Sequence, residues 1–154
     1  MRIRLDNEEN TVKLGKCMAE LLLPGMVLLL VGDLGAGKTT LARGVIKSLG
    51  VEEPITSPTF TLLNLYQGDM EIAHIDAYRL ADSQEGYEAG LEEYLPGRGI
   101  TIIEWPENIK SLIPEQFVQV SLEYAPGENS REAEIIAMGE QYIRMLRELE
   151  AGCR

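Results

Sequence analysis

Apolar runs of strand length alternate with helix-length segments along most of the chain. Residues 26–31 (Met-Val-Leu-Leu-Leu-Val) form a continuous apolar run, and residues 100–105 form a second strongly apolar segment. Such runs are typical of strands buried on both faces of a parallel sheet. Alternating polarity and turn residues predict further strands, two pairs of them joined as hairpins. These strands cover 1–5, 60–66, 70–76, 117–124 and 131–137.

Helices are predicted from apolar spacing and from capping residues. One begins at an N-cap on Asp6, with Glu9 three residues later, and runs to about residue 21 without a clean apolar stripe. A second spans residues 38–49 and ends before Gly50. Shorter helical turns are expected near 87–94 and a last helix over 140–150, beyond about residue 138. Together these elements predict a single α/β domain with three layers, whose mixed, mostly parallel sheet lies between helices.

Composition narrows the function classes. The 154 residues are 45% hydrophobic and 25% charged, as in an ordinary globular domain, and the formal net charge is −11. Because binding to nucleic-acid phosphates requires clustered Lys and Arg, this acidic balance argues against direct RNA or DNA binding. No apolar run approaches the roughly 20 residues that cross a membrane, and no signal-peptide pattern opens the chain. We therefore expect a cytoplasmic protein without a membrane partner.

One motif dominates the sequence. Residues 32–39 (Gly-Asp-Leu-Gly-Ala-Gly-Lys-Thr) match Gly-x-x-x-x-Gly-Lys-Ser/Thr between the apolar strand and the second helix. That context disfavours a glycine-rich turn that binds nothing. Lys38 is expected to contact the β- and γ-phosphates of a nucleoside triphosphate, Thr39 to bind Mg²⁺, and Thr40 to lie beside the α-phosphate. The expected nucleotide-binding residues here are Asp33, Leu34, Gly35, Ala36, Gly37, Lys38, Thr39 and Thr40.

Two acids end neighbouring apolar segments. Asp76 and Glu104 are candidates for supporting Mg²⁺ and for orienting the attacking nucleophile, because ligands bind at the carboxyl ends of parallel strands. Either acid alternatively caps a helix or pairs with Arg79 or Arg98. The chain lacks the Asn/Thr-Lys-x-Asp loop that reads guanine, which favours ATP over GTP. His74 shares a strand face with Asp76, and a lone strand histidine is more often structural.

The ordered motifs together resemble a known family. They are Gly-Asp-Leu-Gly-Ala-Gly-Lys-Thr-Thr (32–40), Thr-Ser-Pro-Thr-Phe (56–60), His-Ile-Asp-Ala-Tyr-Arg-Leu (74–80), Gly-Leu-Glu-Glu-Tyr-Leu (90–95) and Ile-Glu-Trp-Pro-Glu (103–107). From about residue 5 to 140 the chain is similar to the bacterial TsaE family of P-loop ATPases, which serve the threonylcarbamoyladenosine modification at position 37 of tRNA. The resemblance implies ATP and Mg²⁺ as ligands.

The resemblance also implies roles for matching residues. Lys38 would act on the phosphates, Thr59 would behave as a switch residue near the γ-phosphate, and Asp76 and Glu104 would share metal binding and hydrolysis, with their division left open. Two partner subunits, of the TsaB and TsaD type, would carry the contact with tRNA. Hydrolysis by the isolated chain is expected to be slow.

Two other function classes remain open at this point. One is a small-molecule kinase built on the same P-loop scaffold. The other is a nucleotide-sensing module without significant hydrolysis. The loop around Thr59 is expected to leave its hydroxyl groups without partners until a nucleotide binds, although Pro58 holds Ser57 extended.

Overall fold

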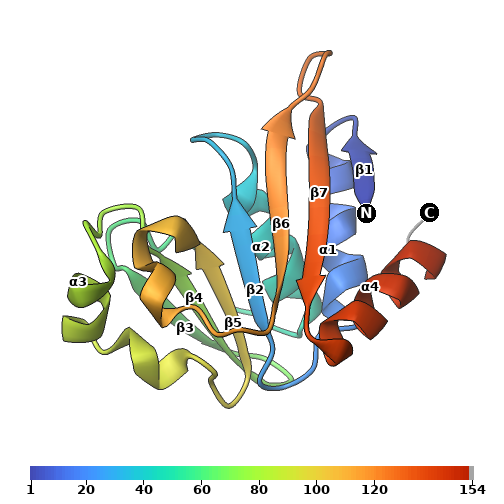
Figure 1. The fold of residues 1–154 in the computed structure, drawn as a ribbon. Coiled ribbons are helices and arrows are strands. Elements are labelled where there is room, and N and C mark those ends of the chain that lie inside the picture. The colour runs from blue at the N-terminus through green and yellow to red at the C-terminus, as the bar shows by residue number, and fades with distance from the viewer. Residues whose placement is uncertain (153–154) are drawn as a thin grey trace.

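A computed structural model describes residues 1–152 as seven strands and six helical segments (Figure 1). The strands are β1 (Arg2–Leu5), β2 (Val27–Val31), β3 (Leu63–Gln67), β4 (Glu71–Asp76), β5 (Ile100–Glu104), β6 (Phe117–Tyr124) and β7 (Arg131–Met138). The helices are α1 (Glu8–Ala19), α2 (Lys38–Ser48), α3 (Ser83–Glu88) and α4 (Glu140–Gly152), with 3₁₀ segments η1 (Leu91–Tyr94) and η2 (Pro106–Leu112). Within this part of the chain, no helix combines the length and the apolar character that crossing a bilayer requires.

The strands form one mixed sheet in the order β1-β7-β6-β2-β5-β4-β3. The four central strands, β6, β2, β5 and β4, run parallel to one another. The outer strands β1, β7 and β3 pair antiparallel, and the two predicted hairpins are present as β3–β4 and β6–β7. The expected mixed sheet with a parallel centre is confirmed. Its parallel arrangement brings the carboxyl ends of β2, β4 and β5 to the same edge.

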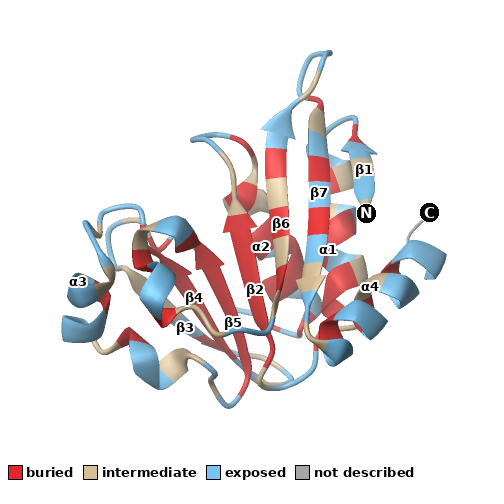
Figure 2. Ribbon diagram, viewed as in Figure 1, coloured by how far each residue is buried: buried red, intermediate tan, exposed pale blue. Residues whose placement is uncertain are grey.

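Helical segments cover the two faces of this sheet unequally. α1, α2 and α4 pack on one face and enclose the larger hydrophobic core. On the other face η1 and η2 bury Leu29 and Ile103, and α3 packs against η2. β6 and β7 leave this second face open, where Ile136 and Met138 are 42% and 49% exposed (Figure 2). The three-layer arrangement is therefore complete over β2, β4 and β5, the strands that carry the candidate site.

The packing of α1 against α2 explains why α1 has no clean apolar stripe. A Cβ atom added at Gly15 would lie 2.7 Å from the carbonyl oxygen of Leu41, and one at Gly44 would lie 2.8 Å from that of Val12. The two helices therefore approach through glycines, and backbone contact replaces part of the side-chain packing. The N-cap is Asn7 rather than Asp6, because the Asn7 side chain accepts the backbone N–H of Asn10 at 2.9 Å.

Other element boundaries differ from those predicted. β3 begins at Leu63 instead of residue 60, since the preceding segment turns toward the site. α3 begins at Ser83 because Asp82 caps it by accepting the backbone N–H of Glu85 at 3.1 Å. η2 follows β5 directly and was not predicted from the hydrophobic pattern.

Candidate functional site

The glycine-rich segment, residues 32–37, forms the loop between β2 and α2. At Gly32 an added Cβ would lie 2.6 Å from the carbonyl oxygen of Leu122, so the loop tolerates only glycine there. Gly37 has a φ of 106° and immediately precedes the first residue of α2. The loop thus leads into a helix N-terminus, where unpaired N–H groups and the helix dipole favour an anion.

The β6–β7 hairpin holds the carbonyl groups of this loop. Arg131 donates from Nε to the carbonyl oxygen of Ala36 and from Nη2 to that of Gly35, both at 3.1 Å. The Tyr124 hydroxyl donates to the carbonyl oxygen of Leu34 at 2.8 Å. The hairpin thus satisfies three carbonyl groups of the loop, and the loop itself adds one hydrogen bond, from the Ala36 N–H to the carbonyl oxygen of Asp33 at 3.0 Å.

Lys38 is folded back onto the same loop. Its Nζ donates to the carbonyl oxygen of Asp33 at 2.9 Å and to that of Gly32, and it lies 4.3 Å from the centroid of the Trp105 ring. The residue is only 5% exposed, and burial lowers the pKa of its ammonium group, an effect that nearby carboxylates oppose. A phosphate group is a stronger acceptor than these carbonyls, so Lys38 is placed to exchange partners when an anion enters.

Glu104 lies at the end of β5 and is 2% exposed. Thr39 donates its hydroxyl to the carboxylate, with distances of 3.0 Å to Oε1 and 3.2 Å to Oε2. His74 Nε2 lies 3.0 Å from the same Oε1 atom. Since the Thr39 hydroxyl has a single proton, donating it to Glu104 leaves the oxygen lone pairs available to a cation.

Asp76 ends β4 beside Glu104 in the strand register. Its Oδ2 accepts the Thr59 hydroxyl at 2.9 Å, and its Oδ1 accepts the backbone N–H of Tyr78 at 2.9 Å. Ser57 Oγ lies 2.7 Å from Thr59 Oγ1. The expectation that the hydroxyls of this loop lack partners without a nucleotide is therefore wrong for Ser57 and Thr59. The bend of the chain before β3 brings them onto each other and onto Asp76.

The structure also tests the alternative that Asp76 or Glu104 forms an ion pair with an arginine. Within residues 1–152, neither acid forms an ion pair with Arg79 or Arg98. Arg79 instead places its guanidinium carbon 4.4 Å from the centroid of the Phe60 ring, and Phe60 is 83% exposed. Neither acid is therefore occupied by one of these arginines.

Most of the predicted site residues line one cavity of about 240 Å³. Its lining residues are Leu34, Gly35, Gly37, Lys38, Thr39, Thr40, Thr59, Asp76, Tyr78, Glu104 and Trp105. Two predicted residues lie apart: Asp33 borders a depression with Glu107 and Glu123, and Ala36 borders a different cavity. Within the described chain no three His, Cys, Asp or Glu residues are grouped closely enough to hold a metal ion alone.

Trp105 forms one wall of this cavity. Its φ of 59° lies in the left-handed region, which is rare for a bulky residue and occurs most often at functional sites. Its ring centroid is 5.0 Å from that of Tyr78, and the same ring covers the Lys38 ammonium group. The ring therefore shields the lysine from solvent.

Because this is the only tryptophan of the chain, it provides a direct readout of the site. We expect ATP to draw Lys38 from the Trp105 ring and so to change the intrinsic fluorescence, since loss of a nearby ammonium group alters the indole environment. The measurement is a fluorescence titration with ATP. A Trp105→Phe variant should bind a fluorescent ATP analogue without giving this signal. An unchanged wild-type spectrum at saturating ATP would contradict the expectation.

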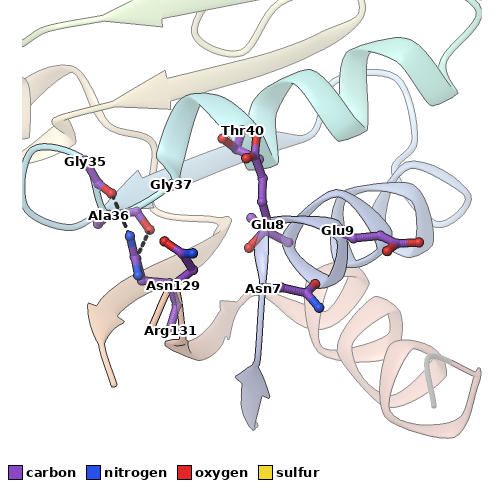
Figure 3. Close-up of a pocket in the computed structure, with 10 residues that line it drawn as sticks. Asn7, Glu8, Glu9, Gly35, Ala36, Gly37, Thr40, Asn129 and Arg131 are labelled. Atoms are coloured by element: carbon purple, nitrogen blue, oxygen red, sulfur yellow. Dashed lines mark hydrogen bonds between the residues drawn. The ribbon is translucent and has the colours of Figure 1, made fainter. Parts of the chain in front are cut away.

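A second cavity, of about 550 Å³, adjoins the first and was missed by sequence reasoning (Figure 3). It lies between the N-terminus of α1, the glycine-rich loop and the β6–β7 hairpin. Its lining residues are Asn7, Glu8, Glu9, Thr11, Gly35, Ala36, Gly37, Thr40, Asn129 and Arg131. Asn129 has a φ of 64°, and residues 125–129 predict only a hairpin turn. No sequence motif links that turn to α1, so only the fold brings these segments together.

These features define a class of protein. A glycine-rich loop ending in Lys-Thr joins the buried parallel strand β2 to a helix. Acids end β5, which pairs with β2, and β4, the next strand in the sheet. This is the P-loop nucleotide-binding fold. The family model described as "Threonylcarbamoyl adenosine biosynthesis protein TsaE" matches residues 5–133, and the chain belongs to this family.

Individual relatives agree with that assignment. The chain is 37% identical over 150 residues to the tRNA threonylcarbamoyladenosine biosynthesis protein TsaE of Bacillus subtilis, covering 97% of this chain and 93% of the relative. It is 46% identical over 139 residues to the Nostoc protein of the same name, covering 87% and 84%. The crystal structure of Bacillus subtilis YdiB superposes with a TM-score of 0.85 at 34% identity, covering 98% of this chain and 94% of that one.

Proposed function

We propose that the chain is a single-domain ATPase that binds ATP with Mg²⁺ and serves the threonylcarbamoyladenosine modification of tRNA. The names of the relatives support the pathway. The observation that carries the chemistry is the contact between Glu104 and Thr39, which places a buried carboxylate against the hydroxyl that follows the P-loop lysine.

The two adjoining cavities support one path for the nucleotide. Both are lined by Gly35, Gly37 and Thr40, so a triphosphate can run along the loop from one into the other. The smaller, with Lys38 and both acids, receives the β- and γ-phosphates. The larger, beside Arg131 and α1, receives the nucleoside. The missing guanine-reading loop favours adenosine there.

Lys38, Thr39 and Glu104 then have distinct roles in the smaller cavity. Lys38 leaves its loop carbonyls and contacts the phosphates. Thr39 would supply a hydroxyl oxygen to Mg²⁺ while its hydroxyl still donates a hydrogen bond to Glu104. Glu104 would thereby orient this metal ligand. When bound, Mg²⁺ neutralises phosphate charge during transfer. The oxygen atoms of Thr39 and Glu104 suit Mg²⁺, which binds few protein ligands and keeps water and phosphate oxygens.

Asp76 and Thr59 form the second half of the proposed site. Their hydrogen bond ties the loop before β3 to the end of β4, beside the place of the γ-phosphate. Asp76 would hold this switch loop and help to orient the attacking water or the metal's water ligands. On this division Glu104 acts through Thr39, and Asp76 acts through the loop.

This role of the loop leads to a prediction about its dynamics. Residues 56–60 should gain amide-exchange protection when ATP and Mg²⁺ bind, because Thr59 then contacts the metal and γ-phosphate as well as Asp76. Hydrogen–deuterium exchange with and without nucleotide measures this. Helix α4, whose residues line neither cavity, serves as an internal reference. Equal protection of the loop in both states would count against its role as a switch.

We further propose that partner subunits of the TsaB and TsaD type complete the function and make the contact with tRNA. Among the described residues that line the smaller cavity there is no arginine to stabilise transition-state charge. Such a group is worth roughly 10³–10⁵ in rate when a partner supplies it. The net charge of −11 suits docking to a more basic partner rather than to tRNA.

Product analysis tests this proposal. The purified chain is incubated with ATP labelled at the γ-phosphate, alone and then with both partner subunits. We expect slow release of labelled free phosphate, accelerated by the partners. Label transferred to another molecule would indicate a kinase instead, and intact ATP under both conditions would indicate a sensing module.

A further inference from the structure

His74 is the only histidine of the chain, and the proposed hydrolysis assigns it no role. It lies within β4, fully buried at 0% exposure. Its Nε2 meets Glu104 Oε1 at 3.0 Å, whereas its Nδ1 has no hydrogen-bond partner among residues 1–152. An unsatisfied buried polar atom lowers folding stability. An apolar residue would avoid this loss, so packing alone does not explain a histidine here.

The geometry around Glu104 indicates what the ring contributes. Glu104 Oε1 accepts hydrogen bonds from two directions, from His74 on β4 and from Thr39 on α2. Thr39 alone would leave the carboxylate free to rotate about its last bond, because one hydroxyl spans both oxygens at similar distances. The second donor fixes the plane of the carboxylate. Since a carboxylate oxygen only accepts, Nε2 carries the hydrogen of this contact.

We propose that His74 is a positioning residue for ATP hydrolysis. Its Nε2–H group holds the carboxylate of Glu104 in the orientation that accepts the Thr39 proton and leaves the Thr39 oxygen directed to the nucleotide's Mg²⁺. This inference rests on the proposed function and deepens it. His74 itself touches neither cavity and acts only through Glu104.

Two variants separate this role from a structural one. His74→Leu removes the donor, and His74→Gln keeps an N–H donor near the position of Nε2. We expect the ATP affinity of His74→Leu, measured in EDTA, to stay within about twofold of the wild type. The increase in affinity caused by Mg²⁺ and the kcat should each fall by roughly 10- to 100-fold, as when metal ligands lose their supporting hydrogen bonds. His74→Gln should recover a large part of both.

Ile102→Val is the matched control. Ile102 lies opposite His74 in the β4–β5 register, is fully buried and makes no contact with the cavity. Its loss of a methylene perturbs the same packing layer but should leave the Mg²⁺-dependent gain unchanged. If His74→Leu behaves as this control does, the positioning role is wrong. If the wild-type chain binds no ATP at all, the proposed function fails instead.

A measurement on the wild-type protein avoids any question of whether the variants fold. The single histidine gives unambiguous ring-nitrogen resonances in a protein without a histidine tag. We expect ¹⁵N spectra to show hydrogen on Nε2, and Glu104→Gln to shift the Nε2 resonance. Glu107→Gln, which changes an exposed acid, should leave it in place. An Nε2 atom without hydrogen, or an Nε2 signal that ignores Glu104→Gln, would overturn the inference.

Discussion

Replacing Lys38 with alanine is expected to weaken ATP binding by roughly 10- to 100-fold, because hydrogen bonds to charged groups contribute about 1.5–3 kcal/mol. Among the described residues that line the smaller cavity, Lys38 is the one lysine or arginine. In the structure its ammonium group donates hydrogen bonds only to carbonyl oxygens of the loop. Titration with a fluorescent ATP analogue gives the affinity. Circular dichroism confirms that the variant is folded.

The stability of that variant follows from the pKa of Lys38. Burial lowers this pKa below the usual 10.5, so the folded protein holds the proton less tightly than the unfolded chain does. The charged lysine therefore lowers folding stability at neutral pH, and stability rises as the pH increases toward 10.5. Lys38→Ala should remove that rise, which thermal unfolding at pH 7 and pH 10 measures.

Lys47→Ala is the matched control, because it removes a lysine from the other end of the same helix, far from either cavity. We expect its ATP affinity to equal that of the wild type. An unchanged affinity in Lys38→Ala would instead remove the basis for placing the nucleotide at the P-loop.

Glu104→Gln should reduce hydrolysis by roughly 100-fold or more, in line with the contribution of positioned acid–base groups. The amide keeps the size of the side chain but removes its negative charge. That charge strengthens the hydrogen bond from the Thr39 hydroxyl and lies beside the proposed metal position. ATP affinity in EDTA should remain or rise slightly, since one negative charge near the phosphates is removed. Single-turnover phosphate release and an affinity titration in EDTA separate the two effects.

Two further variants make the result specific. Asp76→Asn should also reduce hydrolysis severely, because it weakens the anchor of Thr59. Glu115→Gln removes an exposed acid that lines neither nucleotide cavity and should change neither rate nor affinity. If Glu104→Gln alters only the Tm, Glu104 is a structural acid and the division of roles between the two acids is incorrect.

Local sequence was sufficient where one contiguous motif determines the structure. The segment 32–39 carries its glycines, lysine and threonine in order, so both the turn into α2 and the ligand class follow from it. The buried strands β2 and β5 were likewise predicted, since continuous apolar runs are typical of the centre of a parallel sheet.

Contacts between distant segments were not predictable in the same way. Glu104 lies 65 residues from Thr39 and 30 from His74, and only the strand order and register bring the three together. The larger cavity joins α1 to the β6–β7 turn for the same reason. Asp6 and Asn7 are both residue types that cap helices. Only the structure shows that the Asn7 side chain accepts the Asn10 backbone N–H and so caps α1.

The most direct test of this account is a crystal structure with a non-hydrolysable ATP analogue and Mn²⁺, whose anomalous scattering locates the metal. We predict the metal on the Thr39 hydroxyl, with Glu104 still accepting the Thr39 proton and Lys38 moved from its loop carbonyls to the phosphates. The nucleoside should occupy the cavity beside Arg131. Phosphates bound away from residues 32–39, or a Lys38 ammonium group that remains on the Gly32 and Asp33 carbonyls, would contradict the proposed site.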